Sequence, residues 1–474
     1  ALAQKIRNKE ISSYEVVEAH IAHIKKVNPL LNAVVKDRFK KARLEAKEAD
    51  AQLLKITPEK LPPFHGVPCT IKECFALIGM PQSAGLVARK NFRPTQEATA
   101  VIRLRQAGAI PLGITNLSEL CMWMESHNNI YGRTNNPYNP KHIVGGSSGG
   151  EGAIIGAGGS PFGLGSDIGG SIRMPAFFNG VFGHKPTGGM VPGTGQFPTS
   201  SNQALRYLTT GPLTRRAEDL MPLLKILAGP DGKDTGCLPF KLGNPSNINI
   251  KELTVFDVED NGKIKVSKDL REAQEKAVNE LAKQGAFIKK IRIEGLKKSF
   301  DIWSSMLEAA GGPSFKSLLG QGKPINAWAH LIKFFLRRSP HTFPAIGLAF
   351  LENLPKMTPA KTKRFVEYGH TLKKEVVDLI GPEGVMFFPS YPTPAPRHKK
   401  PLFPPFNWVY TAIFNVLELP VTQVPLGLNA KGLPLGVQVV GIHGNDHTTI
   451  AVAMALEKAL GGWVPPELLK EGDT

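Results

Sequence analysis

A stretch rich in glycine and serine, residues 145–195, constrains the fold of this chain more than any other feature of its sequence. It holds two dense clusters, GGSSGG at 145–150 and GSDIGGS at 165–171. A flexible linker would lack large apolar residues, but five are interleaved with these glycines: Ile154, Ile155, Phe162, Leu164 and Ile168. The glycines therefore predict a folded region where backbone closely approaches backbone or a ligand.

Neither cluster matches the common nucleotide-binding or hydrolase motifs. A phosphate-binding loop needs GxxxxGK[ST], and neither cluster supplies the lysine. The GxSxG turn of α/β-hydrolases is also missing from both. What remains is Gly169-Gly170-Ser171, where unhindered N–H groups lead up to a hydroxyl, as an oxyanion site beside a nucleophile requires. A turn is the competing interpretation of this tripeptide.

Lys72 is the second unusual residue, because it ends an apolar segment, 66–72, that is predicted to be a buried strand. Burial disfavours the charged form of an amine, so a buried lysine can serve as a base. A lysine whose amine extends to solvent from the strand end is the alternative. His142 and His184 flank the glycine-rich region outside any triad pattern, and both are predicted to be structural.

The order of predicted elements indicates one α/β domain spanning residues 1–474. Apolar spacing predicts helices at 12–27 and 37–54, within an N-terminal helical layer at 1–60. Further patterns predict a helix at 101–108 and strands at 66–72, 110–113, 385–389 and 433–440. Alternation of helix and strand predicts a mainly parallel sheet. A helical insertion is expected at 309–355.

Charge and apolar bulk coincide in that insertion. The chain carries 58 Lys and Arg against 40 Asp and Glu, a net charge of +18, yet no acidic residue occurs from Ala309 through Leu351. Two short helices are expected there, broken by Pro340 and Pro344. Cations beside aromatic and aliphatic residues are typical of an interfacial membrane anchor; a helix pair buried at a dimer interface is the alternative. Nucleic acid fits less well, because no binding motif accompanies the charge.

Longer segments resemble one known family. The string GGSSGGEGAIIGAGGSPFGLGSDIGGSIRMPAFFNGVFGHKPT at 145–187 is similar to the signature of the amidase signature family, and GVPCTIKE at 66–73 is similar to its lysine segment. Within that family the fatty-acid amide hydrolases are the most similar group. The segments 115–123 and 425–436 also resemble their counterparts in that group. The resemblance implies an α/β/α sandwich, with a central twisted mixed sheet covered by helices.

The resemblance also implies a catalytic mechanism without metal or cofactor. Ser171 would be the nucleophile, Ser147 a bridging serine on a cis peptide after Gly146, and Lys72 the base of a Ser-Ser-Lys triad that forms an acyl-enzyme. The oxyanion hole would be formed by the N–H groups of Ile168, Gly169, Gly170 and Ser171. Three polar neighbours are expected to hold the loop structurally: Ser148, Asp167 and Arg173.

Substrate and membrane contacts follow from the same resemblance. Cys121 and Met122 would line an acyl-chain channel, with packing on a helix face as the alternative. Membrane contact is expected from Phe334, Phe335, Arg337 and Arg338. The implied partners are a long-chain fatty-acid amide, a lipid membrane surface and a second copy of the chain, without nucleic acid, at an intracellular endomembrane or lipid droplet. Three functions compete with this one: a soluble small-amide amidase, a catalytically silent membrane-binding protein, and the glutaminase-type component of an amidotransferase.

The sequence contains four cysteines. Their spacing matches neither a disulfide framework nor a zinc site, and we expect free thiols at Cys69, Cys74, Cys121 and Cys237.

Overall fold

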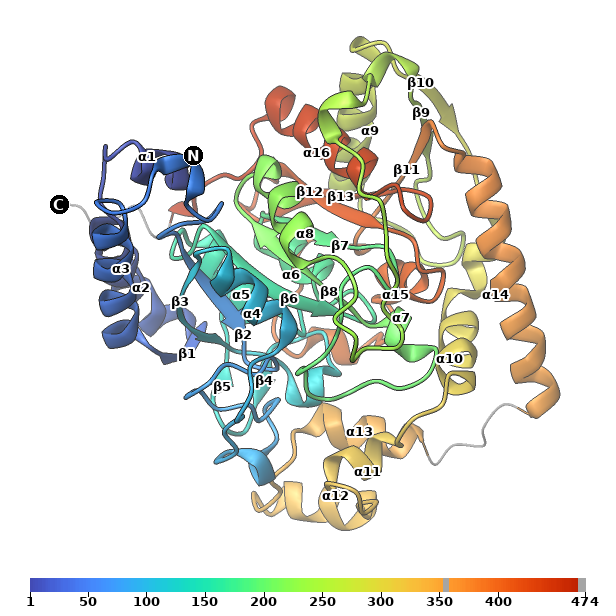
Figure 1. The fold of residues 1–474 in the computed structure, drawn as a ribbon. Helices are drawn as coiled ribbons and strands as arrows, with labels where there is room; N and C mark the ends of the chain where they lie inside the picture. The colour runs from blue at the N-terminus through green and yellow to red at the C-terminus, as the bar shows by residue number, and fades with distance from the viewer. Residues whose placement is uncertain (353–357, 468–474) are drawn as a thin grey trace.

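A computed structural model describes residues 1–352 and 358–467 of the chain. One twisted sheet of 11 strands crosses the molecule (Figure 1). In spatial order its strands are β1 (Val34–Asp37), β3 (Ile110–Thr115), β2 (Pro68–Lys72), β6 (Phe162–Asp167), β8 (Thr209–Thr214), β7 (Phe182–Lys185), β12 (Val421–Leu428), β13 (Pro434–Val440), β11 (Gly384–Phe388), β9 (Thr254–Asp257) and β10 (Phe287–Lys290). A small separate hairpin pairs β4 (His127–Asn128) with β5 (Gly132–Arg133).

The sheet is mixed, as the family resemblance implied, and the expectation of a mainly parallel sheet was wrong. β2 runs parallel to β3 and β6, and β9 runs parallel to β10 and β11. The strands between these two groups pair antiparallel. The short turn at 429–433 explains part of the difference, because it joins β12 to β13 directly, and such hairpins are antiparallel.

Helices cover both faces of the sheet and bury two apolar cores. One face carries α4 (Thr99–Gln106), α8 (Leu220–Leu227) and α16 (Asp446–Leu460), and α9 (Lys268–Lys283) also packs into this core. The other face carries α5 (Gly149–Gly156), α6 (Arg173–Phe178) and α15 (Val409–Val416), with α10 (Ser299–Ala309) and α14 (Pro359–Ile380) packed outside them (Figure 1). The short helix α7 (Ala204–Tyr207) precedes β8. This layering is the α/β/α sandwich that the resemblance implied.

The N-terminal layer is helical but also contributes a strand. The two predicted helices correspond to α2 (Ser13–Leu31) and α3 (Phe39–Gln52), which follow the short α1 (Leu2–Arg7). α2 begins with a capping box, in which Ser12 and Glu15 each bind the other's backbone N–H. The strand between the helices, β1, was not predicted, because it is short and pairs only along one edge of the sheet.

Three helices form a separate layer at one end of the molecule, at the bottom of Figure 1. They are α11 (Phe315–Leu319), α12 (Ala327–Phe335) and α13 (Phe343–Leu351), and we name them the cap helices. They fall in the predicted insertion, whose last residues, 353–355, lie outside the described residues. Pro340 separates α12 from α13 as expected. Pro344 instead lies in the first turn of α13, where its missing N–H leaves no helical bond unmade, so it starts this helix and does not break one.

Candidate active site

Lys72 ends β2, a strand flanked on both sides by other strands and buried along its whole length. Its side chain is fully buried, so the alternative of an amine that extends to solvent was wrong. The Nζ atom donates to the Oγ of Ser147 at 2.7 Å and to the Oγ of Ser166 at 3.0 Å. Within residues 1–352 and 358–467 no carboxylate forms an ion pair with Lys72, so its direct partners are mainly neutral hydroxyls.

Ser147 reaches Lys72 from the turn that precedes α5. The Gly146–Ser147 peptide bond is cis, as the resemblance implied. Backbone packs so closely here that a Cβ on Gly146 would lie 2.3 Å from the main-chain oxygen of Trp123. The glycine at this position is therefore required by close approach of backbone, as the composition predicted.

Ser171 lies between β6 and α6, with 7% of its surface exposed. β6 is the parallel neighbour of β2, so the carboxyl ends of the two strands meet at one edge of the sheet and bring Ser171 into the region of Lys72. The N–H of Ser148 donates to the main-chain oxygen of Ser171 at 3.2 Å, which places the two glycine-serine clusters side by side. No hydrogen bond joins the Oγ atoms of Ser147 and Ser171 in the described part of the chain.

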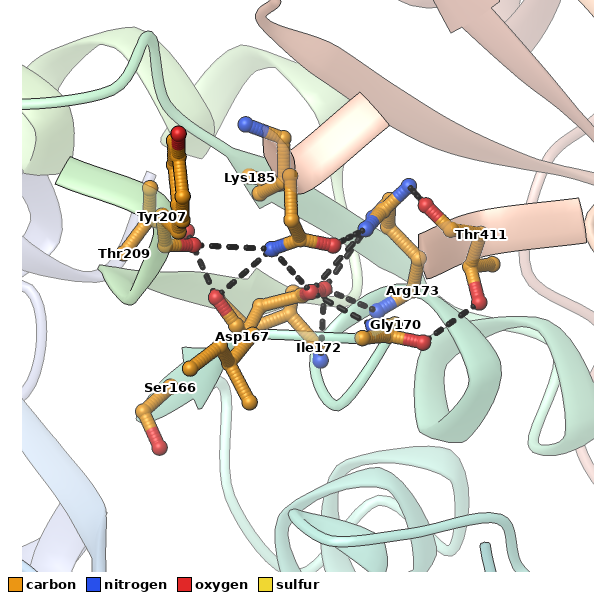
Figure 2. A network of polar contacts seen from close by, with 12 residues as sticks. Ser166, Asp167, Gly170, Ile172, Arg173, Lys185, Tyr207, Thr209 and Thr411 are labelled. Carbon is orange, nitrogen blue, oxygen red and sulfur yellow. Dashed lines mark hydrogen bonds and ion pairs between the residues drawn. The ribbon is translucent and has the colours of Figure 1, made fainter. Parts of the chain in front are cut away.

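A buried ion pair holds the loop that carries Ser171 (Figure 2). Asp167 and Arg173 are both fully buried, and Arg173 donates to the Asp167 carboxylate from Nη2 at 2.9 Å and from Nε at 3.0 Å. Burial alone would raise the pKa of the Asp167 carboxyl, but the Arg173 charge and the N–H of Ile172 hold it well below its usual range. Arg173 also donates to the main-chain oxygen of Thr411 at 2.7 Å, which ties the loop to α15. Asp167 and Arg173 thus have the structural role that was expected.

The same network occupies one of the four N–H groups predicted for the oxyanion hole. The N–H of Gly170 donates to Asp167 Oδ1 at 2.7 Å, so in this conformation it is not free for a substrate oxygen. Within the described residues, the N–H groups of Ile168, Gly169 and Ser171 have no protein acceptor. Three of the four predicted donors therefore have no protein acceptor in this conformation, and the assignment of the oxyanion hole stays a prediction.

Cys121 and Met122 lie on a 3₁₀ turn, η3 (Glu119–Cys121), and on its C-terminal flank. This turn is not α-helical, because Leu120 and Cys121 have left-handed φ values of 52° and 60°, and the place of Cys121 and Met122 in an acyl-chain channel stays a prediction. Cys121 packs against the main apolar core, and the nearby Cys74 thiol, Lys72 and Ser147 lower the pKa of its thiol to about 6, against burial. Met122 packs on the other side, against the apolar cluster that the cap helices form. The turn therefore lies between the catalytic candidates and the cap helices.

Two buried carboxyl groups next to these residues were not predicted. Glu151 accepts from the hydroxyls of Thr70 at 2.6 Å and Thr115 at 2.8 Å, and burial raises its pKa to about 8. Burial also raises the pKa of Glu73, to about 7, although it accepts from Ser83, Ala84 and Tyr131. One signal was present: Thr70 and Lys72 alternate along β2, so they share one polar face inside the sheet.

The predicted membrane contacts lie at the end of α12 and in the segment that joins it to α13. Phe335 is 74% exposed, Arg337 and Arg338 are exposed as well, and Phe334 is half-buried. Trp328, 66% exposed, and Ile332 continue the apolar face of α12. A groove of about 710 Å³ opens beside this face, and its lining includes Val87, Asn129, Phe334, Phe335, Arg337 and His341. Lys72, Ser147 and Ser171 do not line it, so this groove is separate from the candidate catalytic residues.

An acidic side chain fixes the cap helices to the η3 turn. Glu119 is buried and accepts from His341 Nδ1 at 2.7 Å and from the N–H of Thr342 at 2.8 Å, both at the start of α13. Over the described ranges, no helix has both the length and the hydropathy needed to cross a membrane. Those residues likewise contain no group of His, Cys, Asp and Glu side chains arranged to hold a metal ion. All four cysteines are free thiols, as predicted.

Comparison with known proteins assigns this site to a family. The family model Amidase matches residues 15–450. Human fatty-acid amide hydrolase 2 is 48% identical over 98% of this chain and 89% of its own length. One component of the glutamyl-tRNA(Gln) amidotransferase of Geobacillus stearothermophilus is 30% identical over 96% of this chain and 95% of its own length. The solved structure of 6-aminohexanoate cyclic dimer hydrolase superposes with a TM-score of 0.81 at 27% identity, over 99% of this chain and 98% of that one. The chain therefore belongs to the amidase family and is a serine amidase.

Proposed function

We propose that this protein hydrolyses fatty-acid amides to a free fatty acid and an amine, with Ser171 as the nucleophile. One observation carries the proposal: a fully buried lysine amine, Lys72, is held 2.7 Å from the hydroxyl of Ser147, beside the loop that bears Ser171. Such an amine, bonded to hydroxyls and without an ion-pair partner among the described residues, is suited to accept and return a proton.

In the proposed reaction the proton travels through two hydroxyls. As Ser171 Oγ attacks the amide carbonyl carbon, its proton passes to Ser147 Oγ, and the proton of Ser147 passes to the neutral amine of Lys72. The free N–H groups of Ile168, Gly169 and Ser171 are suited to bind the oxygen that becomes negative. The same relay returns the proton to the leaving nitrogen as its bond to carbon breaks. Water then attacks the acyl-enzyme, loses its proton through the same route and releases the fatty acid.

The apolar surroundings support a long acyl chain as substrate. The η3 turn connects the two regions: Lys72 and Ser147 are among the nearby groups that lower the pKa of the Cys121 thiol, while Met122 packs against the cluster of the cap helices. An acyl chain following this turn from Ser171 would reach the cap helices and their exposed apolar face. Human fatty-acid amide hydrolase 2, whose name states the same substrate class, is 48% identical to this chain.

We further propose that the cap helices bind a lipid membrane surface, as an insertion within the single amidase domain. Trp328, Ile332 and Phe335 are exposed along α12, and Arg337 and Arg338 follow them. Aromatic rings that insert at the boundary of headgroups and acyl chains, flanked by cations, favour binding to anionic lipid. A hydrophobic amide would then enter from the bilayer at an intracellular membrane or lipid droplet. The same exposed face also suits pairing of two copies of the chain.

A fluorophosphonate probe and an amide series test the proposed function together. The purified protein should be labelled by the probe, and the Ser171→Ala variant should not. Turnover should rise with acyl length from acetamide to long-chain amides of the same amine. If the parent protein is not labelled, the hydrolase mechanism is wrong. A preference for acetamide or glutamine would instead support a small-amide amidase or the glutaminase-type component of an amidotransferase, the activity that the 30% identical relative suggests.

A further inference from the structure

One aromatic side chain outside the proposed triad reaches the loop that carries Ser171. Trp303 lies on α10, and its indole Nε1 donates to the main-chain oxygen of Ile168 at 3.1 Å. The two residues are 135 positions apart in sequence, so the fold brings them together. The proposed proton relay does not use this bond.

The bond acts on the peptide unit that joins Ile168 to Gly169. This unit is trans, and in a trans peptide the C=O and the N–H that follows it lie in one plane and point in opposite directions. A donor that fixes the oxygen of Ile168 therefore also fixes the direction of the Gly169 N–H. That N–H has no protein acceptor among the described residues and is one of the donors proposed for the substrate oxygen.

The next peptide unit along the loop is already held at both of its ends. The main-chain oxygen of Gly169 accepts from Thr411 Oγ1 at 2.8 Å, and the N–H of Gly170 donates to Asp167 Oδ1 at 2.7 Å. Glycine at position 169 leaves the backbone free to rotate between the two units. Among the side chains of the described residues, the indole alone donates to the unit before it. The orientation of the Gly169 N–H therefore depends on this bond.

The Trp303 ring is held in place independently of that bond. It meets the Trp408 ring edge to face, with the ring centroids 4.6 Å apart at an angle of 75°, a favourable geometry for aromatic pairs. Trp408 directly precedes α15, and its ring centroid lies 6.2 Å from that of Phe300. A Cβ on Gly169 would lie 3.8 Å from the Trp408 ring and 3.9 Å from the Trp303 ring, so both indoles pack beside the Gly169 backbone. Loss of the N–H alone should therefore leave the packing intact.

We propose that Trp303 is a positioning residue of the oxyanion hole: its indole N–H holds the Ile168–Gly169 peptide unit so that the Gly169 N–H points at the oxygen that becomes negative when Ser171 attacks. Trp303 acts through this peptide unit and not on the substrate itself. The role rests on the proposed function, because it requires Ser171 to be the nucleophile. Removing one oxyanion donor costs about 10²–10³-fold in kcat, so a donor left free to turn should cost at least about tenfold.

Trp303→Phe removes the indole N–H and keeps an aromatic ring, and Trp463→Phe supplies the matched control. Trp463 is also partly buried, and its Nε1 donates to the main-chain oxygen of Gly156 at 2.9 Å, at the end of α5. With a long-chain amide as substrate, kcat of Trp303→Phe should fall at least about tenfold at unchanged KM, the pattern of an interaction made only in the transition state. Trp463→Phe should lose a similar amount of Tm and keep the kcat of the parent.

Benzothienylalanine at position 303 repeats the test with less change of shape. Its ring has sulfur where indole has N–H, so it packs like tryptophan but cannot donate to the oxygen of Ile168. It should reproduce the fall in kcat with a Tm close to that of the parent, even if Trp303→Phe folds poorly.

A long-chain trifluoromethyl ketone reports on the oxyanion directly. Ser171 Oγ adds to the ketone carbon, its proton passes through Ser147 to Lys72, and the ketone oxygen takes up the electron pair and becomes negative, while no group leaves. Because this adduct resembles the tetrahedral intermediate, inhibition by the ketone should weaken in both Trp303 variants in the same proportion as kcat/KM falls. The long-chain alcohol of the same length forms no oxyanion and should inhibit the parent and the variants equally.

Equal kcat in the parent and both Trp303 variants would overturn this role of Trp303 and leave the proposed function standing. Inhibition by the alcohol that weakens as much as inhibition by the ketone would also overturn it, because Trp303 would then shape the site for the substrate chain. A parent protein that is neither labelled by the fluorophosphonate probe nor inhibited by the ketone would overturn the proposed function, and the role of Trp303 with it.

Discussion

Replacing Asp167 with asparagine tests the charge network that holds the Ser171 loop. The change removes the negative charge that faces Arg173, and both side chains are fully buried. It also turns one acceptor oxygen into an amide nitrogen. At the Oδ2 position that nitrogen would face three donors: the N–H of Ile172 and both the N–H and Nε of Arg173. At the Oδ1 position it would face Gly170, Arg173 and Asn415. In either orientation of the amide, its NH₂ group therefore faces N–H donors that lose their acceptor.

The expected loss is about 3–5 kcal/mol, the usual cost of removing one partner from a buried ion pair. Unfolding entropy is about 2 cal/mol/K per residue, so a chain of 474 residues loses roughly 1 °C of Tm per kcal/mol. We therefore expect Tm to fall by about 3–5 °C in Asp167→Asn. Amidase kcat should fall by at least about tenfold, because the free N–H groups beside Gly170 lose their fixed orientation.

Thermal unfolding followed by circular dichroism measures this loss, and an exposed ion pair supplies the control. Lys374 and Asp378 pair on the surface of α14, so Asp378→Asn should cost less than about 1 kcal/mol and leave Tm within about 1 °C. Combining Asp167→Asn with Arg173→Met should destabilise less than the sum of the two single changes. A Tm for Asp167→Asn equal to that of Asp378→Asn would refute the assigned role of the buried pair.

Three further outcomes are expected. Lys72→Met should lower amidase kcat by about 10²–10⁴-fold, the usual contribution of a general base, and an unchanged kcat would exclude Lys72 as the base. Lys185 is fully buried, with its amine donating to the main-chain oxygen of Pro186, and burial lowers its pKa to about 7. The unfolded chain then binds more protons than the folded one between pH 7 and about 10.5, so stability rises with pH over that window. Lys185→Met should accordingly raise Tm most below pH 7, by about 1–4 °C, with a gain that shrinks toward pH 10; a gain independent of pH would contradict charge burial as its cause. A variant with Phe334 and Phe335 changed to Ser, and Arg337 and Arg338 changed to Gln, should no longer sediment with vesicles that contain anionic lipid, while its Tm stays unchanged. Equal sedimentation of the parent and this variant would exclude the cap helices as the membrane contact.

The sequence predicted most elements that carry regular apolar spacing. The strand ending at Lys72 and the helices α2 and α3 are found close to their expected bounds. β6 was not predicted, because glycines at alternate positions, Gly163 and Gly165, obscure its pattern. Those glycines are required by neighbours from elsewhere in the chain: a Cβ on Gly163 would lie 1.8 Å from the Glu151 carboxylate.

In the candidate site, too, the sequence predicted some features, and others could be found only in the structure. Local context along the chain identified Lys72 and Ser171 as candidates, and the family resemblance added Ser147. The bond from the Gly170 N–H to Asp167 depends on the angle of a loop, and the left-handed φ values of Leu120 and Cys121 depend on the packing of the η3 turn. Neither has a signature in local composition, so both required the three-dimensional structure.

The η3 turn lies between the cap helices and the buried Lys72. Glu119 binds the two residues that precede α13, and Cys121, two positions later, lies near Lys72 and Ser147, which contribute to the lowered pKa of its thiol. Because the main chain between them is fixed in a left-handed bend, a shift of α13 displaces the thiol along with the carboxylate. A lipid contact that moved the cap helices would thus also move the three-residue η3 turn beside Lys72.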